Sequence, residues 1–267
     1  MSIPDTTAPE PTDRGVKPPD GLTASQRRPG ASTWRRVYRQ PLGIIALTIA
    51  GILVLVALFA PLLADYPGSY GDSPLQAPSG QHWFGTDSLG RDVLGEVIWG
   101  TRQSLLVAFA ASAIAIFVGT LLAVIAAYAR RLDGAIGTFV DLMLALPVLP
   151  LMIMVAALVG PSTGTIIVVI AAFSWPQVTR VVRSQALTVV TLPYVDAARL
   201  MTTSAPWILR KHVIPAAMPV IAVSVVFTTS HAVLAAAGLA FLGLGDPNTW
   251  SWGLILYQAQ QAGAMAS

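Results

Sequence analysis

Cysteine is absent from the 267 residues, and charged residues make up only 11% of them. The first absence excludes disulfide bonds and thiolate metal sites. The second separates the chain from soluble domains, in which about a quarter of the residues are charged. Because 54% of the residues are hydrophobic and the mean hydropathy is +0.66, the chain cannot cover its surface with polar groups in water. It therefore belongs in a bilayer.

Motifs for nucleotide binding and for hydrolysis are also missing. The sequence holds no G-x4-G-K-[ST] phosphate loop, no G-x-S-x-G nucleophile elbow and no H-E-x-x-H zinc pair. The three histidines, His82, His212 and His231, lie on different segments and on different sides of the predicted membrane, so they cannot share a metal ion. No catalytic or metal-binding residue is predicted, and an intramembrane enzyme is the weakest interpretation.

The N-terminal residues differ in composition from the rest of the chain. Residues 1–33 are rich in Pro, Thr, Asp and Gly and lack the apolar core of a signal peptide, which predicts a disordered cytoplasmic tail. Residues 34–63 hold a short basic segment and the first apolar run.

Five apolar stretches reach or approach the roughly 20 residues that a membrane span needs. They are residues 42–63, 104–129, 137–159, 163–182 and 216–242. We expect Pro147 and Pro150 to kink the third stretch and Trp175-Pro176 to break the fourth. The residues between the third and fourth stretches, Gly160-Pro161-Ser162, suit only a tight turn.

The basic residues lie on alternate connections between these stretches. Residues 1–40 hold seven Lys or Arg, the second connection between spans holds Arg130 and Arg131, and the stretch 175–215 before the fifth span holds five, so these three segments hold fourteen of the sixteen. Residues 64–103 hold two Arg against five acids. The positive-inside rule therefore predicts a cytoplasmic N-terminus, an external loop at 64–103 and an external C-terminal segment at 243–267.

The basic connection before the fifth span, residues 183–215, contains a helix-prone run. Y-V-D-A-A-R-L-M follows Pro193, which suits the start of a helix, and Thr202 and Thr203 then disfavour its continuation. Small Ala197 and Ala198 allow close approach by another surface. The loop has no chemistry of its own, so composition leaves two alternatives: a docking surface for a protein partner, or a basic surface facing anionic lipid headgroups.

The pattern D-A-A-x3-T-x10-V-I-P in this loop resembles the EAA loop of bacterial ABC importer permeases, whose usual form is E-A-A-x3-G ending in I-x-L-P. The resemblance implies a short coupling helix that sits in a cleft of an ATP-hydrolysing subunit. The residues of that docking site would be Tyr194, Val195, Asp196, Ala197, Ala198, Arg199, Leu200, Met201, Thr202, Thr203 and Ser204. Thr202 stands where the family has Gly, and Thr does not adopt a positive φ without steric cost.

A second motif, H-W-F-G-T-D-S-L-G-R-D-V-L, lies in the loop 64–103. Thr86 or Asp87 suits a helix cap and Asp87 and Arg91 form an i,i+4 pair, so the pattern predicts an amphipathic helix on the outer surface. The run is also similar to the C-type permease subunit of dipeptide and oligopeptide ABC importers, as are A-F-L-G-L-G at 240–245 and D-L-M-L-A-L-P at 141–147. The residues of this external motif are Phe84, Gly85, Thr86, Asp87, Leu89, Gly90, Arg91 and Asp92.

The resemblance covers about residues 38–262 and implies an all-α polytopic helical bundle of the type I ABC importer permease kind, with a permease core at 104–242. The family continues into a sixth span, so five predicted spans imply a shortened subunit or a truncated reading frame. The implied location is the inner membrane of a bacterium.

The implied function is import of dipeptides and oligopeptides by a permease subunit that pairs with a second, homologous permease in the bilayer. One or two ATP-binding subunits would supply energy and would bind the ATP and Mg, while this chain would bind no cofactor. An extracytoplasmic binding protein would deliver the substrate, and no nucleic acid is expected. The same machinery importing nickel, glutathione or haem is the alternative. A self-contained secondary transporter is less favoured because no inverted repeat is visible.

Overall fold

The structure is a computed structural model that describes residues 41–68, 71, 73–201 and 204–263. The predicted cytoplasmic tail, 1–33, and residues 34–40 lie outside the described residues. The chain divides into two units, residues 1–49 and 50–267. Helix α2, Pro41–Leu63, runs across that boundary, and every other element belongs to the second unit.

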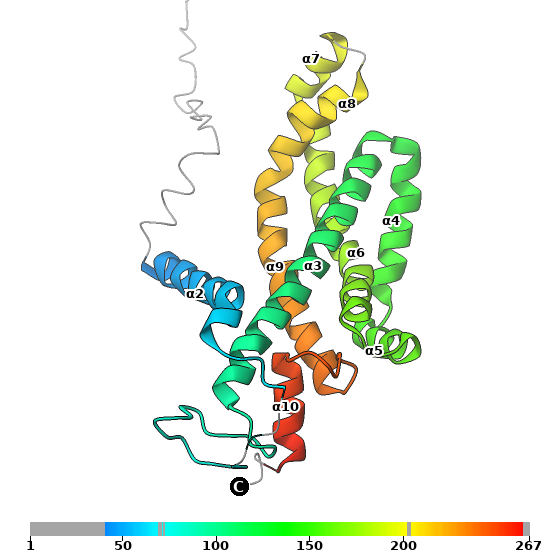
Figure 1. The fold of residues 1–267 in the computed structure, drawn as a ribbon. Helices are drawn as coiled ribbons and strands as arrows, with labels where there is room; N and C mark the ends of the chain where they lie inside the picture. The colour runs from blue at the N-terminus through cyan, green and yellow to red at the C-terminus, as the bar shows by residue number, and fades with distance from the viewer. Residues whose placement is uncertain (1–40, 69–70, 72, 202–203, 264–267) are drawn as a thin grey trace, which may run out of the picture. The chain divides into compact units, whose positions relative to one another are not determined.

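The elements of the second unit are all helices, and the described residues hold no strand beyond one isolated bridge between Thr86 and Asp92. Three long helices, α3, α6 and α9, lie side by side, with α7 and α8 at one end of them and α10 near the other (Figure 1). The helices are α3 (Val93–Tyr128), α4 (Arg130–Ala145), α5 (Val148–Val159), α6 (Thr163–Val190), α7 (Pro193–Met201), α8 (Ala205–Ile208), the π-helix η1 (Leu209–Val213), α9 (Ile214–Phe241) and α10 (Trp252–Gln261).

Four helices among the described residues are long and apolar enough to cross a membrane: α2, α3, α6 and the continuous run Pro206–Phe241. A fifth candidate is the pair α4 and α5, which bends by 83° at its break. The predicted all-α membrane bundle is therefore confirmed. The expected kink in the third stretch is a full break, because Leu146 takes the extended backbone that a following proline favours and cannot continue α4.

The fourth stretch differs from the prediction in two ways. The prediction that Trp175-Pro176 breaks it was wrong, since α6 runs unbroken through both residues. Proline removes only one backbone hydrogen bond, and the buried side chains of Val178 and Val182 hold the following turns in a core cluster with Ala123 of α3. Helix α6 also continues to Val190, so the connection before α7 is much shorter than the predicted loop 183–215.

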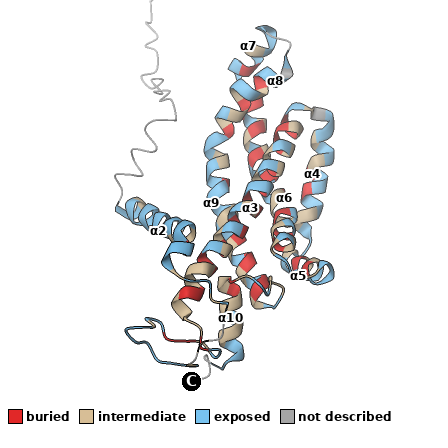
Figure 2. Cartoon of the chain, viewed as in Figure 1, coloured by how far each residue is buried: buried red, intermediate tan, exposed pale blue. Residues whose placement is uncertain are grey.

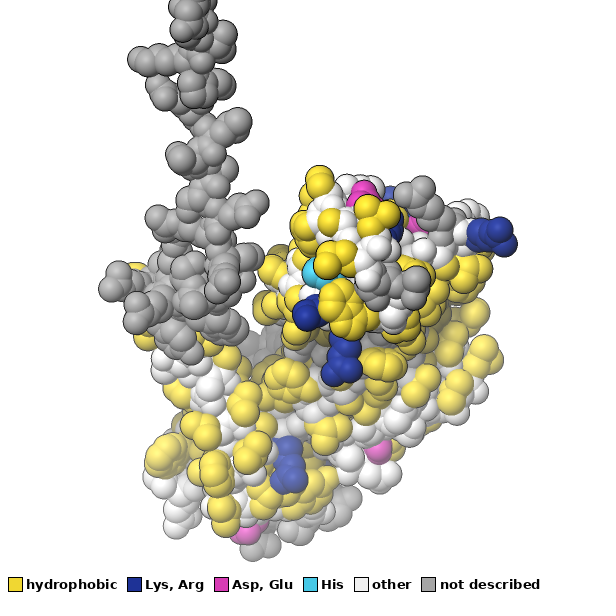
Figure 3. Space-filling model, turned by 90° about the horizontal axis from the view of Figure 1, so that it is seen from above, with side chains coloured by type: hydrophobic (Ala, Val, Ile, Leu, Met, Phe, Trp, Pro, Cys, Tyr) yellow, Lys and Arg dark blue, Asp and Glu magenta, His cyan; other side chains and the backbone are white. Residues whose placement is uncertain are grey.

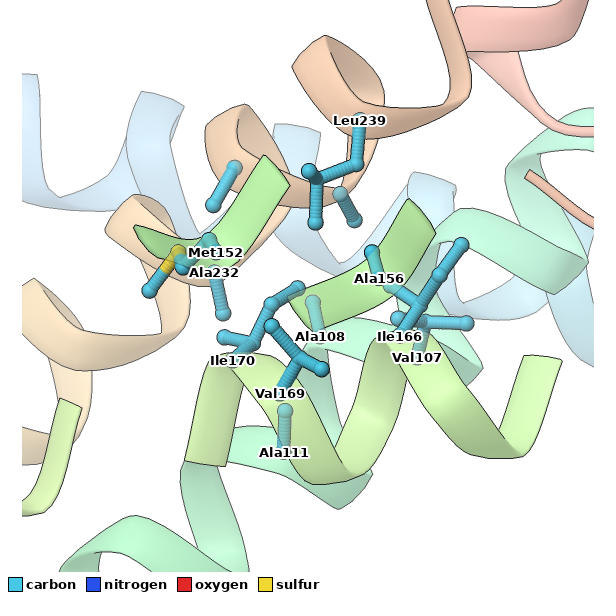
Figure 4. Packing of buried hydrophobic residues seen from close by; sticks show 12 residues of the cluster. Val107, Ala108, Ala111, Met152, Ala156, Ile166, Val169, Ile170, Ala232 and Leu239 are labelled. Atoms are coloured by element: carbon cyan, nitrogen blue, oxygen red, sulfur yellow. The ribbon is translucent and has the colours of Figure 1, made fainter. Parts of the chain in front are cut away.

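Small side chains allow the long helices to approach one another closely. The largest core cluster joins Ala108 and Ala111 of α3, Ala156 of α5, and Ala232 and Ala235 of α9 with larger residues of α6 (Figure 4). At Gly119 of α3, a Cβ atom would lie only 2.7 Å from the Cβ of Val178. The buried positions follow the facing sides of the helices, and the outward sides are exposed (Figure 2). Such packing is typical of helices that associate in a bilayer.

Candidate functional site: two docking surfaces

Helix α7 is fastened to the ends of the long helices by one fully buried side chain. Val195 is 0% exposed and belongs to a cluster with Ala127 of α3, with Ala186 and Val189 of α6, and with Val213 of η1. Its backbone amide donates to the carbonyl of Leu192, which closes the turn after α6. The helix therefore has one side fixed against α6 and η1, and its other sides face outward.

The outward sides of α7 carry most of the residues predicted for docking. Leu200 and Met201 are 91% and 89% exposed. Asp196 and Arg199 form an exposed ion pair at 3.2 Å, and Ala197 beside them is exposed. Seen from this end, hydrophobic side chains lie beside basic ones (Figure 3). Two large apolar side chains that bury almost none of their surface make this end of α7 a candidate interaction site.

The remaining predicted docking residues are placed only in part. Tyr194 is exposed, Ala198 is half-buried and Ser204 is exposed. Thr202 and Thr203 lie outside the described residues, so the substitution of Thr for the usual Gly at position 202 has no structural outcome. The structure brings the predicted residues from Tyr194 to Met201 together on one short helix.

Sequence reasoning missed a ring cluster beneath α7. The His212 ring lies between those of Tyr194 and Trp207, with centroid distances of 5.8 and 5.3 Å, and the Lys211 ammonium lies 4.8 Å from the centre of the Trp207 ring. Nε2 of His212 is buried and has no hydrogen-bond partner among the described residues. These residues meet because η1 is a π-helix, a register that often marks functional sites and that periodicity in the sequence does not reveal.

The loop before α3 corrects the second prediction. Residues 84–92 form turns, not an amphipathic helix, and α3 begins only at Val93. Gly85 and Gly90 have φ values of +74° and +78°, which interrupt any helix there. Asp92 caps α3 by accepting from the amide of Gly95 at 3.0 Å, so the predicted caps Thr86 and Asp87 have other roles.

Thr86 and Asp87 organise the loop through hydrogen bonds. The Thr86 hydroxyl donates to the carbonyl of Ser73 at 2.7 Å and accepts from the amide of Gln76 at 2.8 Å. The Asp87 carboxylate accepts from the amides of Leu89 and Arg91, each at 2.8 Å, and from the Arg91 guanidinium at 2.9 and 2.7 Å. Burial raises the pKa of Asp87, but these hydrogen bonds and the charge of Arg91 outweigh it and hold the pKa below its ordinary value.

Arg91 joins this loop to the C-terminal segment. Its guanidinium lies 4.6 Å from the centre of the Trp250 ring and donates to Oε1 of Gln258 at 3.3 Å. The same group lies 3.4 Å from the carboxylate of Glu96, whose side chain is almost fully buried. The Asp87–Arg91 pair was predicted, and it is present, but it lies at a junction between distant segments and not along a helix.

Further bonds complete this junction, which we call the cap (residues 64–68, 73–92 and 243–262). The Trp250 indole donates to the carbonyl of Pro67 at 2.9 Å, and the Tyr66 hydroxyl donates to the carbonyl of Asn248 at 2.7 Å. The Trp252 indole donates to the Thr101 hydroxyl at 3.2 Å. The cap leaves large apolar side chains exposed. The most exposed are Leu75, Trp83 and Phe84, and Tyr66, Leu256 and Leu89 are exposed to a smaller extent.

The described residues contain no group of three or more His, Cys, Asp or Glu that could hold a metal ion. The geometry thus offers two candidate docking surfaces, α7 and the cap, at the two ends of the long helices.

Comparison with known proteins identifies the family of the chain. Residues 115–266 match the family of binding-protein-dependent transport system inner membrane components, and residues 28–78 match the N-terminal transmembrane domain of oligopeptide transport permease C. A dipeptide transport system permease protein of Alkalihalophilus pseudofirmus is 35% identical over 259 residues, 94% of this chain and 83% of that relative.

Two other relatives give the same indication. A glutathione transport system permease protein of Pectobacterium atrosepticum is 33% identical over 241 residues, covering 88% of this chain and 80% of its own length. A probable peptide ABC transporter permease protein of Sinorhizobium fredii is 38% identical over 221 residues, covering 82% and 76%. The chain therefore belongs to the family of binding-protein-dependent transport system inner membrane components, as an ABC transporter permease of the peptide type.

Proposed function

We propose that this chain is one of two permease subunits of an ATP-driven importer and that α7 is the coupling helix received by an ATP-hydrolysing partner. The observation that carries the proposal is the contrast along α7: Val195 is fully buried against the long helices while Leu200 and Met201 are almost fully exposed. A basic surface that only faced lipid headgroups would not need these two apolar side chains in an outward position.

The fold supplies a route for movement from α7 into the bilayer. Helix α7 packs against the end of α6, and α8 and η1 continue into α9 as one apolar run, Pro206–Phe241. A displacement of α7 by closing ATPase subunits would therefore move α6 and α9 as packed bodies, switching the spans between inward-facing and outward-facing arrangements. In this arrangement the N-terminus and α7 are cytoplasmic, and the cap is external.

The cargo we propose is a dipeptide or oligopeptide, delivered to the cap by an extracytoplasmic binding protein. The names of the relatives support it, since they are a dipeptide, a probable peptide and a glutathione transport permease. The exposed Trp83 and Phe84 of the cap would supply apolar contact area for that partner. Nickel, glutathione or haem remain alternative cargoes for the same machinery.

A paired exchange on α7 tests the proposal. Leu200→Glu with Met201→Glu removes two apolar anchors, worth about 3–6 kcal/mol when fully buried in an interface, so docking should weaken by about a hundredfold or more. The measurements are co-purification of the ATPase from membranes and peptide uptake by reconstituted vesicles. The matched control, Leu200→Met with Met201→Leu, keeps the apolar area and should behave as the wild type.

A second exchange tests close approach. Ala197→Glu and Ala198→Glu should uncouple ATP hydrolysis from uptake while leaving the amount of permease in the membrane unchanged, since Ala197 is exposed and Ala198 is only half-buried. Undiminished peptide uptake and ATPase retention in the charged variants of both pairs would refute docking through α7.

A further inference from the structure

Four polar side chains meet around one cavity between the long helices. Ser174 and Gln177 lie three residues apart on α6, and Thr228 and His231 lie three residues apart on α9, so each pair shares one side of its helix. The cavity has a volume of about 240 Å³. The rest of its lining is apolar and includes Met152 of α5, which the break between α4 and α5 places there.

None of these four side chains has a hydrogen bond or an ion pair with another residue in the part of the chain that the structure describes. The Gln177 and His231 side chains are exposed, and those of Ser174 and Thr228 are half-buried. The unmet bonding groups are an amide, an imidazole and two hydroxyls, so the face can both donate and accept hydrogen bonds.

These four side chains lie far from the ends of α6 and α9, so exposing them to lipid would be costly. Gln177 lies near the middle of α6, fourteen residues after Thr163 and thirteen before Val190, which is about 20 Å from either end. His231 lies about 15 Å from the end of α9 at Phe241. An amide without a partner costs several kcal/mol in hydrocarbon, so polar side chains at such a depth face protein or water.

A second groove, between α3 and α9, shows the contrast. Its lining is dominated by Phe109, Ile116, Phe117 and Met218, and the Thr229 hydroxyl beside it donates to that of Ser112 at 3.0 Å. The buried Thr120 hydroxyl also lines that groove without a hydrogen-bond partner among the described residues, but the other lining side chains are mainly apolar and suit an acyl chain or an apolar helix. Of these two cavities, the one lined by Ser174, Gln177, Thr228 and His231 therefore suits a polar cargo better.

We infer that Ser174, Gln177, Thr228 and His231 form the part of this chain that lines the water-filled translocation path and bonds to the backbone amides and carbonyls of a peptide in transit. The inference rests on the proposed function. It adds which side chains would line the path and which groups of the peptide they would bind. Because these side chains include no carboxylate and no Lys or Arg, this face would hold the main chain of a peptide with little regard to its sequence. Arg180 is the next charged residue along α6. It lies 3.8 Å from the carboxylate of Asp141 on α4, so the two charges offset each other.

The absence of cysteine allows a direct test. Ser174→Cys is nearly isosteric and keeps the packing, and His231→Cys reports from α9. The controls are Val168→Cys on α6 and Val226→Cys on α9, which are 63% and 64% exposed but lie on other sides of the same helices. Each variant is placed in the complete importer in vesicles and treated with a charged, membrane-impermeant methanethiosulfonate reagent, which reacts only with hydrated thiolate.

We expect Ser174→Cys and His231→Cys to react about tenfold faster than the two controls or more, since apolar surroundings suppress the thiolate. A dipeptide presented on the binding protein together with ATP should slow both reactions. Reaction as slow as in the controls, in variants that still take up peptide, would overturn the translocation face alone. Fast reaction that peptide and ATP never alter would overturn the contact with cargo. A wild-type complex that neither binds an ATPase nor transports would instead overturn the proposed function.

Discussion

The partly buried ion pair of the cap allows a sharp prediction about stability. Asp87→Asn keeps the size of the side chain and one acceptor oxygen but removes the charge that Arg91 faces. In the wild type, the carboxylate receives four hydrogen bonds from Arg91 and Leu89. An Asn amide would turn an NH2 donor toward at least one of these donors, so the loop must rearrange or leave Arg91 unpaired.

The burial of the pair gives the magnitude. The side chains of Asp87 and Arg91 are only 14% and 13% exposed. Breaking a buried pair by removing one partner costs about 3–5 kcal/mol, and because Glu96 offers Arg91 a second acid at 3.4 Å we expect the lower value, about 3 kcal/mol. The same exchange at Asp196 breaks a pair whose side chains are 60% and 36% exposed. That pair is worth about 1 kcal/mol or less.

Hydrogen exchange of the cap peptides, measured by mass spectrometry on the detergent-solubilised protein, is the assay. A loss of about 3 kcal/mol raises the population of the open loop roughly a hundredfold, so the amides of Leu89 and Arg91 should exchange far faster in Asp87→Asn. The Asp196→Asn variant should leave them unchanged. Equal protection of both amides in the wild type and in Asp87→Asn would show that the carboxylate does not hold the loop, and the reasoning would fail.

Three further outcomes follow from the structure, each measured as the apparent thermal unfolding midpoint in detergent. The pKa of Asp87 is lower in the folded protein than in the unfolded chain. The carboxylate therefore stabilises the fold fully above the unfolded pKa of about 4, and this stabilisation is lost as the pH falls through the folded pKa. The difference in unfolding midpoint between the wild type and Asp87→Asn should therefore narrow below about pH 4. Gly253→Ala should destabilise by about 1–3 kcal/mol, since its Cβ would clash with the carbonyl of Ala237 in α9, whereas Gly238→Ala meets nothing within 4 Å and should not destabilise. Ser162→Ala should cost about 1 kcal/mol, because its hydroxyl caps α6. An unchanged midpoint in Gly253→Ala or in Ser162→Ala, or an Asp87→Asn deficit that stays constant below about pH 4, would contradict the corresponding expectation.

Hydropathy predicted the positions of the long helices well and their polar ends poorly. The first run, 42–63, matches α2 within one residue, and the fifth, 216–242, matches α9 within two. The second run began at Ser104, but α3 begins eleven residues earlier at Val93. Those first turns carry Glu96 and Arg102 and pack under the cap. A window that seeks membrane-like composition therefore begins after the helix does.

The docking helix was predictable because its information is local. A proline, a run of good helix formers and two breakers lie within eleven residues, and α7 forms where they predict a helix. The cap was not predictable, because Arg91 meets Gln258 across 167 positions and Trp250 meets Pro67 across 183. No local pattern reports such pairings. The positive φ of Gly85 and Gly90 also overrode the helical spacing of Asp87 and Arg91.

The two ends of the long helices are built for different tasks under the proposed function. The cap is held by side-chain hydrogen bonds between distant segments, so a binding protein would meet a preformed surface. Helix α7 is held by Val195 and the rings beneath it, and its contacts lead directly into α6 and α9. These are the two helices that carry the unpartnered polar side chains of the central cavity. A push on α7 would therefore act on the walls of the cavity, which is the mechanical requirement for opening a path to one side at a time.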